Sequence, residues 1–426
     1  MSETPQQVEP GSAAAVAEAP PPAPVLHVAP SPHVYDTALT TRRMMIDVLI
    51  ALIPVVLVSL YVFRLYAVKH VALCLLACLL AELAFSTLRG TAHVVLLVLA
   101  AAWLAGLWLV HRFAPDLGAW AGVARQGVVF GGLGVMLAAG LLLAVRGRRK
   151  VTILDGSAAV TGLILALSLP GAAPWYVSVI GSFVAIGIGK VLFGGLGQNI
   201  FNPAMVGRAF VLLAFAGAVG ASGYRLPPRE AVASRPAGLM ELTRSDAITR
   251  PTPLTVGKKI AKKLSAGEAL APDERMPRLA DLLLGNTNGS LGETSALACL
   301  VGGLYLLIRR TASWQIPAGV LGAVVVIGGL MHLFGDPTFT LPHHLLGGAL
   351  LFGAFFIATD PVSSPITPKG KLIFGAGIGA LVMLIRTLSN YPEGVMFAVL
   401  LMNAVVPLIN RWTIPTPIGG PVPRKE

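Results

Sequence analysis

The stretch Gly194-Gly195-Leu196-Gly197-Gln198-Asn199-Ile200-Phe201-Asn202-Pro203-Ala204-Met205-Val206-Gly207 joins two long apolar runs and decides the fold. Irregular backbone at membrane depth survives only where protein or a polar cavity covers it. The stretch therefore predicts a break between two membrane helices, with Asn202 as side-chain cap and Pro203 in the first turn of the second helix. A tight helix hairpin with no chemistry is the alternative interpretation. The candidate break residues are Gly195, Gly197, Asn199, Asn202 and Pro203.

The composition excludes a soluble domain. Of 426 residues, 55% are hydrophobic and 12% are charged, and a soluble surface needs about twice that charge. The net charge of +12 could indicate a nucleic-acid partner. However, the basic residues form short clusters between apolar runs, which is the pattern that orients a membrane protein. We therefore predict a polytopic membrane protein and no nucleic-acid partner.

Three cysteines, Cys74, Cys78 and Cys299, lie inside apolar segments. Cys74 and Cys78 share a helix face, but no histidine or further cysteine lies nearby in the sequence to complete a metal site. We interpret all three as small buried apolar side chains and expect neither a metal nor a disulfide.

The apolar runs predict an all-α fold with about twelve transmembrane helices of roughly 20 residues each. The N-terminal residues lack the periodicity of a folded segment and the apolar core of a signal peptide. The expected organisation is a disordered cytoplasmic tail at 1–41, a first membrane half at 42–219 with an inserted hairpin at 92–145, an extracytoplasmic loop at 220–292, a second half at 293–411, and a cytoplasmic tail at 412–426.

The two halves resemble each other. Without the hairpin, five spans precede the long loop and five follow it, and an odd number in each half makes the repeats inverted. Asp155–Gly162 and Glu293–Gly302 open spans in a similar way. Inverted repeats with interrupted helices are typical of transporters, whose breaks face a shared site.

Basic clusters set the expected orientation. Placing Arg42-Arg43, Arg146–Lys150, Arg309-Arg310 and Lys369–Lys371 in the cytoplasm leaves less charge in the opposite short links. The long loop then lies outside, which is allowed because long loops escape the charge rule.

Three acids are candidates for an ion pathway. Glu82 lies within an apolar span, where an ionisable group is a functional hypothesis by default; a protonated side chain or one that reaches the interface is the alternative. Asp360, in the polar break Ala358–Gly370, could meet a cation or only cap free N–H groups. Glu393 stands at a helix start, where a carboxylate complements the dipole.

Within the outer loop, Asp246 precedes two threonines, Thr249 and Thr252, in a proline-stiffened turn. Taken alone, this is an ordinary surface turn. Across the chain, no Ser/His/Asp set, phosphate-binding loop or metal-ligand cluster indicates another chemistry, and no catalytic residue is assigned.

Together these stretches resemble one family, that of the RnfD membrane component of the Rnf electron-transport complex and its sister, the NqrB component of the sodium-translocating NADH:quinone reductase. The low-complexity tail favours the Rnf side. The matching pieces are Ser31–His33, Thr41–Met45, Asp155–Gly162, Gly194–Gly207, Thr359–Val362, Lys371–Ala376, and Tyr391–Gly394 through Pro407-Leu-Ile409.

The resemblance implies a multi-pass component of a complex in the bacterial inner membrane. This complex would couple electron flow between ferredoxin and NAD to movement of Na⁺ or H⁺. The implied partners are other membrane and peripheral subunits and a flavin transferase. Asn410 stands where the family often has an aspartate, which removes one possible carboxylate for a cation. A solute channel or transporter on the same inverted repeat, without a redox role, is the alternative, and it leaves the turn from Asp246 to Leu254 unexplained.

The resemblance also implies FMN joined through its phosphate to a threonine hydroxyl. Asp246, Thr249 and Thr252 occupy the family's motif, so Thr252 is the expected attachment residue, in an outer loop that the transferase can reach. Arg250-Pro251 stands where Gly-Ala is usual, and proline restricts its own φ and the residue before it. A second, non-covalent flavin such as riboflavin is a further expectation.

Overall fold

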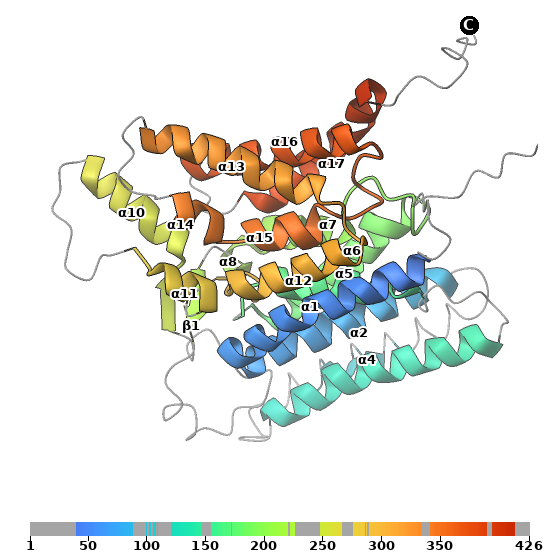
Figure 1. Ribbon diagram of the computed structural model, residues 1–426. Coiled ribbons are helices and arrows are strands. Elements are labelled where there is room, and N and C mark those ends of the chain that lie inside the picture. The colour runs from blue at the N-terminus through green and yellow to red at the C-terminus, as the bar shows by residue number, and fades with distance from the viewer. Residues whose placement is uncertain are drawn as a thin grey trace, which may run out of the picture.

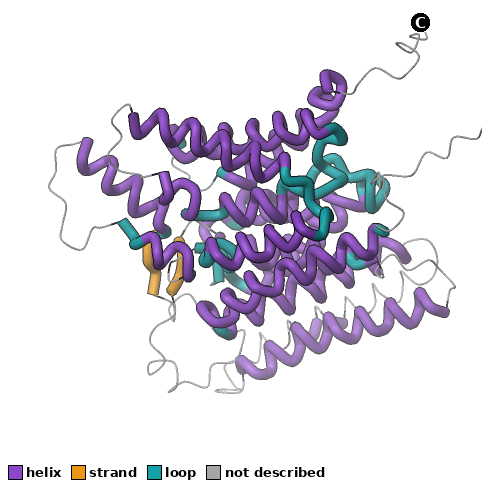
Figure 2. Tube along the Cα trace, in the orientation of Figure 1, coloured by secondary structure: helices purple, strands orange, loops and turns teal. Residues whose placement is uncertain are grey.

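The computed structural model is a bundle of helices whose long axes run across the view in Figure 1, with short loops gathered at one end (Figure 2). It describes residues 40–87, 121–146, 155–171, 173–219, 222–225, 248–265, 276–285, 289–333, 341–389 and 394–413, together with 99, 102–103, 105–107, 109 and 287.

Helices before the long loop form the first half of the bundle. They are α1 (Thr41–Phe63), α2 (Leu65–Thr87), α5 (Ser157–Ser168), α6 (Trp175–Ile186), the π-helix η3 (Gly187–Val191), α7 (Pro203–Ala214) and the single turn α8 (Ala216–Val219).

Helices after the long loop form the second half. They are α12 (Ala296–Ile308), α13 (Gln315–Leu333), α14 (Leu341–Leu346), α15 (Leu350–Phe352), the π-helix η5 (Gly353–Ile357), α16 (Pro368–Leu388) and α17 (Val395–Thr413).

Five of the described helices, α1, α2, α13, α16 and α17, are long and apolar enough to cross a membrane, and several shorter apolar helices accompany them. Their outward faces carry large apolar side chains such as Leu57, Val326 and Leu401. In water such a surface would be costly, whereas lipid solvates it. The chain is a multi-pass membrane protein, as the composition predicts.

The two halves share one core. Its buried side chains come from both halves, for example Leu52 of α1, Leu165 of α5, Phe352 of α15 and Phe374 of α16. Helix α1 packs against α12 and α7 packs against α17, so that two pairs of helices join the halves.

Helix α4 (Ala121–Arg146) lies along the outside of the bundle and packs against α2 (Figure 1). Leu73 and Ala77 of α2 meet Val129 and Leu133 of α4 in a small separate cluster. The described part of the inserted hairpin is thus peripheral to the main core.

Two short strands depart from the all-α expectation. β1 (Ser222–Arg225) pairs antiparallel with β2 (Ile248–Pro251), with Ser222 opposite Pro251. They lie with α10 (Pro253–Ser265) and α11 (Leu279–Leu284) at the end of the bundle opposite the loops that follow η3 and η5 (Figures 1 and 2). Both strands are polar and four residues long, so they carry no apolar alternation that would have predicted them.

Glycine sets the close packing of α6 on α7. A Cβ placed on Gly207 would lie 2.5 Å from the Gly181 carbonyl oxygen and 2.8 Å from Ala185 Cβ. Small residues allow membrane helices to approach to backbone contact. The last glycine of the opening stretch is therefore required by packing.

We expect Gly207→Ala to lower the free energy of unfolding by about 1–3 kcal/mol, because the added methyl forces α6 and α7 apart. Gly322→Ala on α13 is the matched control, since a Cβ there meets nothing within 4 Å. Thermal unfolding in detergent measures both. Equal melting temperatures for the two variants would contradict this account of the α6–α7 contact.

Candidate functional site

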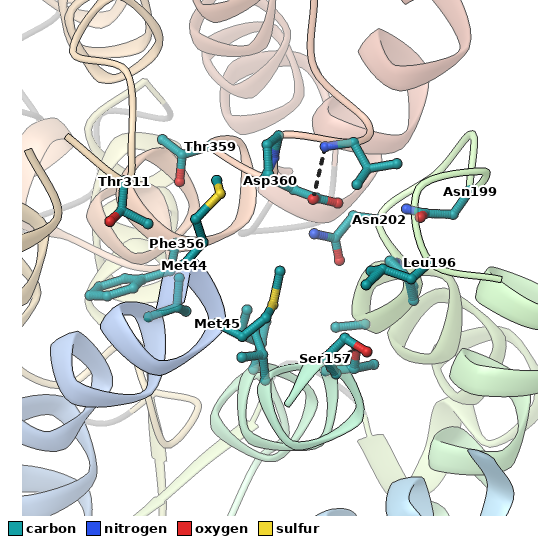
Figure 3. A pocket seen from close by; sticks show the side chains of 18 of the residues that line it. Met44, Met45, Ser157, Leu196, Asn199, Asn202, Thr311, Phe356, Thr359 and Asp360 are labelled. Atoms are coloured by element: carbon teal, nitrogen blue, oxygen red, sulfur yellow. Dashed lines mark hydrogen bonds between the residues drawn. The ribbon is translucent and has the colours of Figure 1, made fainter. Parts of the chain in front are cut away.

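A pocket opens where α1, α5 and α7 begin and where η3 and η5 end (Figure 3). Leu196, Asn199 and Asn202 line it from the first polar break, and Thr359 and Asp360 line it from the second. The two breaks, which are more than 150 residues apart in the sequence, thus meet at one site.

Met44, Met45 and Phe356 supply apolar walls to this pocket, and Lys190 supplies a cation. Figure 3 shows Met45 and Ser157 facing Asn202 and Asp360 across the space. Pockets lined by a few polar groups among apolar walls are typical sites for small molecules and cofactors.

The two breaks share one local design. Each follows a π-helix, η3 or η5, and each leads into a helix with proline in its first turn. Asn202 Oδ1 accepts from Met205 N at 3.2 Å, as the sequence predicts, and Thr367 Oγ1 accepts from Gly370 N at 3.0 Å. A π-helix shifts the register of a helix end and is frequent at functional sites.

Glycine allows the first break to turn. Gly195 and Gly197 have φ values of 101° and 89°, which L side chains rarely adopt. Asn199 Nδ2 donates to Phe201 O at 3.1 Å and so satisfies a carbonyl inside the turn. The predicted break is therefore stabilised by its own backbone geometry and side chains.

Asn403, in the middle of α17, connects the two breaks. Its Oδ1 accepts from Asn202 N at 3.5 Å and its Nδ2 donates to Ser363 O at 2.7 Å. Asn202 Nδ2 adds a bond to Ile357 O at 3.4 Å. Asn403 is 1% exposed, so its amide is shielded from bulk solvent.

Asp360 turns its carboxylate back onto its own loop. Oδ1 accepts from Val362 N at 3.2 Å, and Oδ2 accepts from Ser363 Oγ at 2.9 Å. Burial raises the pKa of this loop carboxyl from its ordinary value, and the two hydrogen bonds oppose that shift. Asp360 therefore caps a free backbone N–H of its loop and also lines the pocket.

Glu82 forms a buried ion pair with Lys190. Lys190 Nζ lies 2.6 Å from Glu82 Oε1 and also donates to Ser157 Oγ at 2.6 Å. Ser157 Oγ donates in turn to Asp155 Oδ1 at 2.6 Å. Glu82 is therefore not isolated, because it is buried and paired with a cation. Its Oε2 has no hydrogen-bond partner among the described residues.

Asp47 of α1 is a second buried acid beside the pocket. It accepts hydrogen bonds from Tyr305 Oη at 3.3 Å, Arg309 Nε at 3.3 Å and Thr311 Oγ1 at 2.9 Å. These bonds tie the start of α1 to the end of α12. Three donors therefore satisfy this buried carboxylate.

Thr252 follows β2 directly and caps α10. Its Oγ1 lies 2.8 Å from Thr255 Oγ1 and accepts from Thr255 N at 3.3 Å. The residue is 5% exposed. The sequence predicted that the Thr252 hydroxyl would be accessible to the transferase. It is instead buried, because the segment continues into a helix that packs on the bundle.

Thr249 lies in β2 opposite Tyr224, while Asp246 and Glu393 lie outside the described residues.

Helix α10 is fastened to the ends of α14 and α16. Lys258 Nζ donates to Ser389 O at 2.7 Å, and the buried Leu254 packs near Gly347. Arg386 donates to His344 O at 2.6 Å and to Gly347 O at 2.8 Å. Desolvation and the positive charge of Arg386 lower the pKa of Lys258.

Thr252 and the pocket lie at opposite ends of the bundle. The pocket adjoins the loop that starts α16, whereas Lys258 holds α10 at Ser389, just after α16 ends. The 21 residues of α16 span about 32 Å at 1.5 Å each. A group joined to Thr252 and a group in the pocket would therefore be two separate ligands.

A family profile described as the NQR2, RnfD, RnfE family matches residues 27–138 and 128–419. The chain belongs to this family. It is similar to the D subunit of the Na(+)-translocating ferredoxin:NAD(+) oxidoreductase complex of Acetobacterium woodii, at 33% identity over 91% of this chain and 93% of that protein. It is also similar to the D subunit of the ion-translocating oxidoreductase complex of Stutzerimonas stutzeri, at 45% identity over 64% of this chain and 78% of that protein.

The residues matched by the NQR2, RnfD, RnfE family profile include both the pocket-lining residues and Thr252. Asn410, which replaces the expected aspartate, accepts from Ile366 N at 3.1 Å in the second break. An amide thus holds this loop without adding a charge.

Cys74 and Cys78 are fully buried in α2, as small apolar side chains.

Sequence reasoning missed Lys190 and Asn403 as site residues of this family member. Lys190 stands inside an apolar run of the sequence and is 3% exposed in the structure. Asn403 stands inside an apolar run. A single amide in a membrane span is the signal that could have identified it, because an unsatisfied amide there is costly.

Proposed function

We propose that this chain, as the D subunit of an ion-translocating oxidoreductase complex, carries FMN covalently at Thr252 and couples electron transfer between ferredoxin and NAD⁺ to translocation of Na⁺ or H⁺. The observation that carries the proposal is the match over nine-tenths of the chain to a relative named for that activity. Thr252, behind Thr249 and before Pro253-Leu254, supports the flavin linkage. Other subunits of the complex and a flavin transferase are the partners.

The proposed layout is twelve membrane helices in an inverted five-plus-five repeat with an added hairpin. The starts of α1, α5 and α7 meet the ends of α12 and η5 around one pocket, which supports opposite directions for the two halves. In this layout α12, which packs on α1, is the counterpart of α1.

The proposed location is the bacterial inner membrane, with the pocket end in the cytoplasm. Arg42-Arg43 precede the pocket-lining Met44, and Arg309-Arg310 precede Thr311, so the described basic clusters share that end. The segment with β2 and α10 then faces outward, where the transferase acts.

The pocket is the proposed site of a second, non-covalent flavin such as riboflavin. Met44 and Phe356 offer apolar surface for a flat aromatic ring, while Asn199, Asn202 and Lys190 offer groups for polar ring atoms and hydroxyls. A flavin supplies one- and two-electron chemistry, and the protein positions and tunes it.

The proposed ion pathway includes Glu82, Asp360 and Glu393. Lys190 connects Glu82 to the pocket, because it donates a hydrogen bond to Glu82 and also lines the pocket. A more negative group in the pocket would attract Lys190 and weaken its hold on Glu82, which then needs another cation. Coupling would follow if this change biases one element between two conformations.

In-gel flavin fluorescence tests the covalent linkage. Parent, Thr252→Ala and the control Thr387→Ala, at an exposed threonine near the end of α16, are produced in a host that contains the transferase and run on a denaturing gel. We expect fluorescence in the parent, none in Thr252→Ala, and a band of parental intensity in Thr387→Ala. A dark parent band, from a colourless purified complex, would instead favour the channel or transporter without a redox role.

A further inference from the structure

The Thr252 hydroxyl, to which FMN would be attached, is buried and hydrogen-bonded. Thr252 Oγ1 contacts both the hydroxyl and the backbone N–H of Thr255, in a residue that is 5% exposed. The inference below rests on the proposed attachment of FMN at Thr252, and it concerns when that attachment occurs.

Attachment requires Oγ1 to reach the phosphorus of an activated flavin ester, such as a flavin dinucleotide. The Oγ1–P bond forms as the pyrophosphate P–O bond breaks. The nucleoside monophosphate leaves with the electron pair, and the threonine proton passes to a base of the transferase. Nucleophile and leaving group lie roughly in line in such a transfer. A side chain 5% exposed in a helix cap cannot enter another enzyme's active site in that arrangement.

The burial of Thr252 depends on α10 lying against the bundle. Leu254 is 2% exposed and Ile260 is 6% exposed, so the apolar face of α10 is covered. Lys258 adds a hydrogen bond to Ser389 O at the end of α16. Thr252 immediately precedes this helix, and it becomes accessible only if the segment from Thr252 into α10 moves away.

We propose that FMN is attached before α10 docks on α14 and α16, and that docking then shields the linkage. An ester oxygen can still accept from Thr255 N, and a phosphate at the start of a 13-residue helix is favoured by the helix dipole and its free N–H groups. Docking is thus a step that follows modification and closes the site to further exchange.

The test uses the full chain, made in a host without the transferase and purified in detergent. It is then incubated with purified transferase and flavin dinucleotide, and the initial rate of covalent labelling is followed by in-gel fluorescence. Lys258→Met weakens docking by removing the bond to Ser389 O. Lys259→Met, at an exposed lysine on the same helix, is the matched control.

We expect the folded parent and Lys259→Met to label slowly, and Lys258→Met to label about ten-fold faster, because losing one hydrogen bond of a charged group shifts an opening equilibrium by that order. Ile260→Ala, which removes packing and leaves the charge, is expected to act in the same direction and replaces Lys258→Met if that variant does not fold.

Equal or slower labelling of both docking variants would overturn the proposed order, since the docked form would then be the substrate. A parent that stays dark even from a host with the transferase would overturn the proposed function itself, and this inference with it. The two failures are therefore distinct.

Discussion

Lys190→Met is expected to lower the free energy of unfolding by about 3–5 kcal/mol and to abolish ion transport, because it leaves the Glu82 carboxylate buried without its partner. Lys190 and Glu82 are each 3% exposed and joined at 2.6 Å. The loss should be visible as a lower melting temperature of the purified protein in detergent. Glu82→Gln is expected to destabilise less, since Lys190 keeps its bond to Ser157.

The double variant Glu82→Gln/Lys190→Met separates stability from transport. Removing both charges takes away the desolvation cost as well as the attraction, so most of the stability of the parent should return. Transport in proteoliposomes should not return if the pair lies on the ion pathway. A double variant that transports ions at the parental rate would remove Glu82 from that pathway and leave the pair a structural role.

The features that sequence predicted are those set by neighbouring residues. Asn202 and Pro203 form the predicted cap and first turn, because a side-chain cap and a fixed proline φ act within one helical turn. The apolar runs likewise predicted membrane helices, since lipid acts on each segment directly. Even the meeting of the two breaks was expected, from the resemblance between the halves.

The individual partners of residues that lie far apart in the sequence were not predicted. Glu82 is paired across 108 residues and Asn403 bonds Asn202 across 201 residues. No local period encodes such a partner, because many lysines and amides in the chain could satisfy the same group. The burial of Thr252 escaped for a related reason. It depends on where α10 docks, whereas the turn around Thr252 looks like exposed surface.

Asn403→Leu is expected to empty the pocket of non-covalent flavin while leaving the covalent flavin in place. The substitution removes the bonds from Asn403 to Asn202 N and to Ser363 O. A buried polar group left without its partner costs about 1–3 kcal/mol, so both breaks lose the connection that holds them around the site. Thr252 lies near the other end of α16, which is about 32 Å long, and its linkage should be unaffected.

Acid extraction separates the two flavins, because it releases only the non-covalent one. We expect extractable flavin to fall below detection in Asn403→Leu while the fluorescent gel band keeps its parental intensity. Leu401→Ala, at a 54% exposed position of the same helix, should retain both. Parental levels of extractable flavin in Asn403→Leu would mean that the meeting of the two breaks does not form the flavin site, and the pocket would then belong to the ion pathway alone.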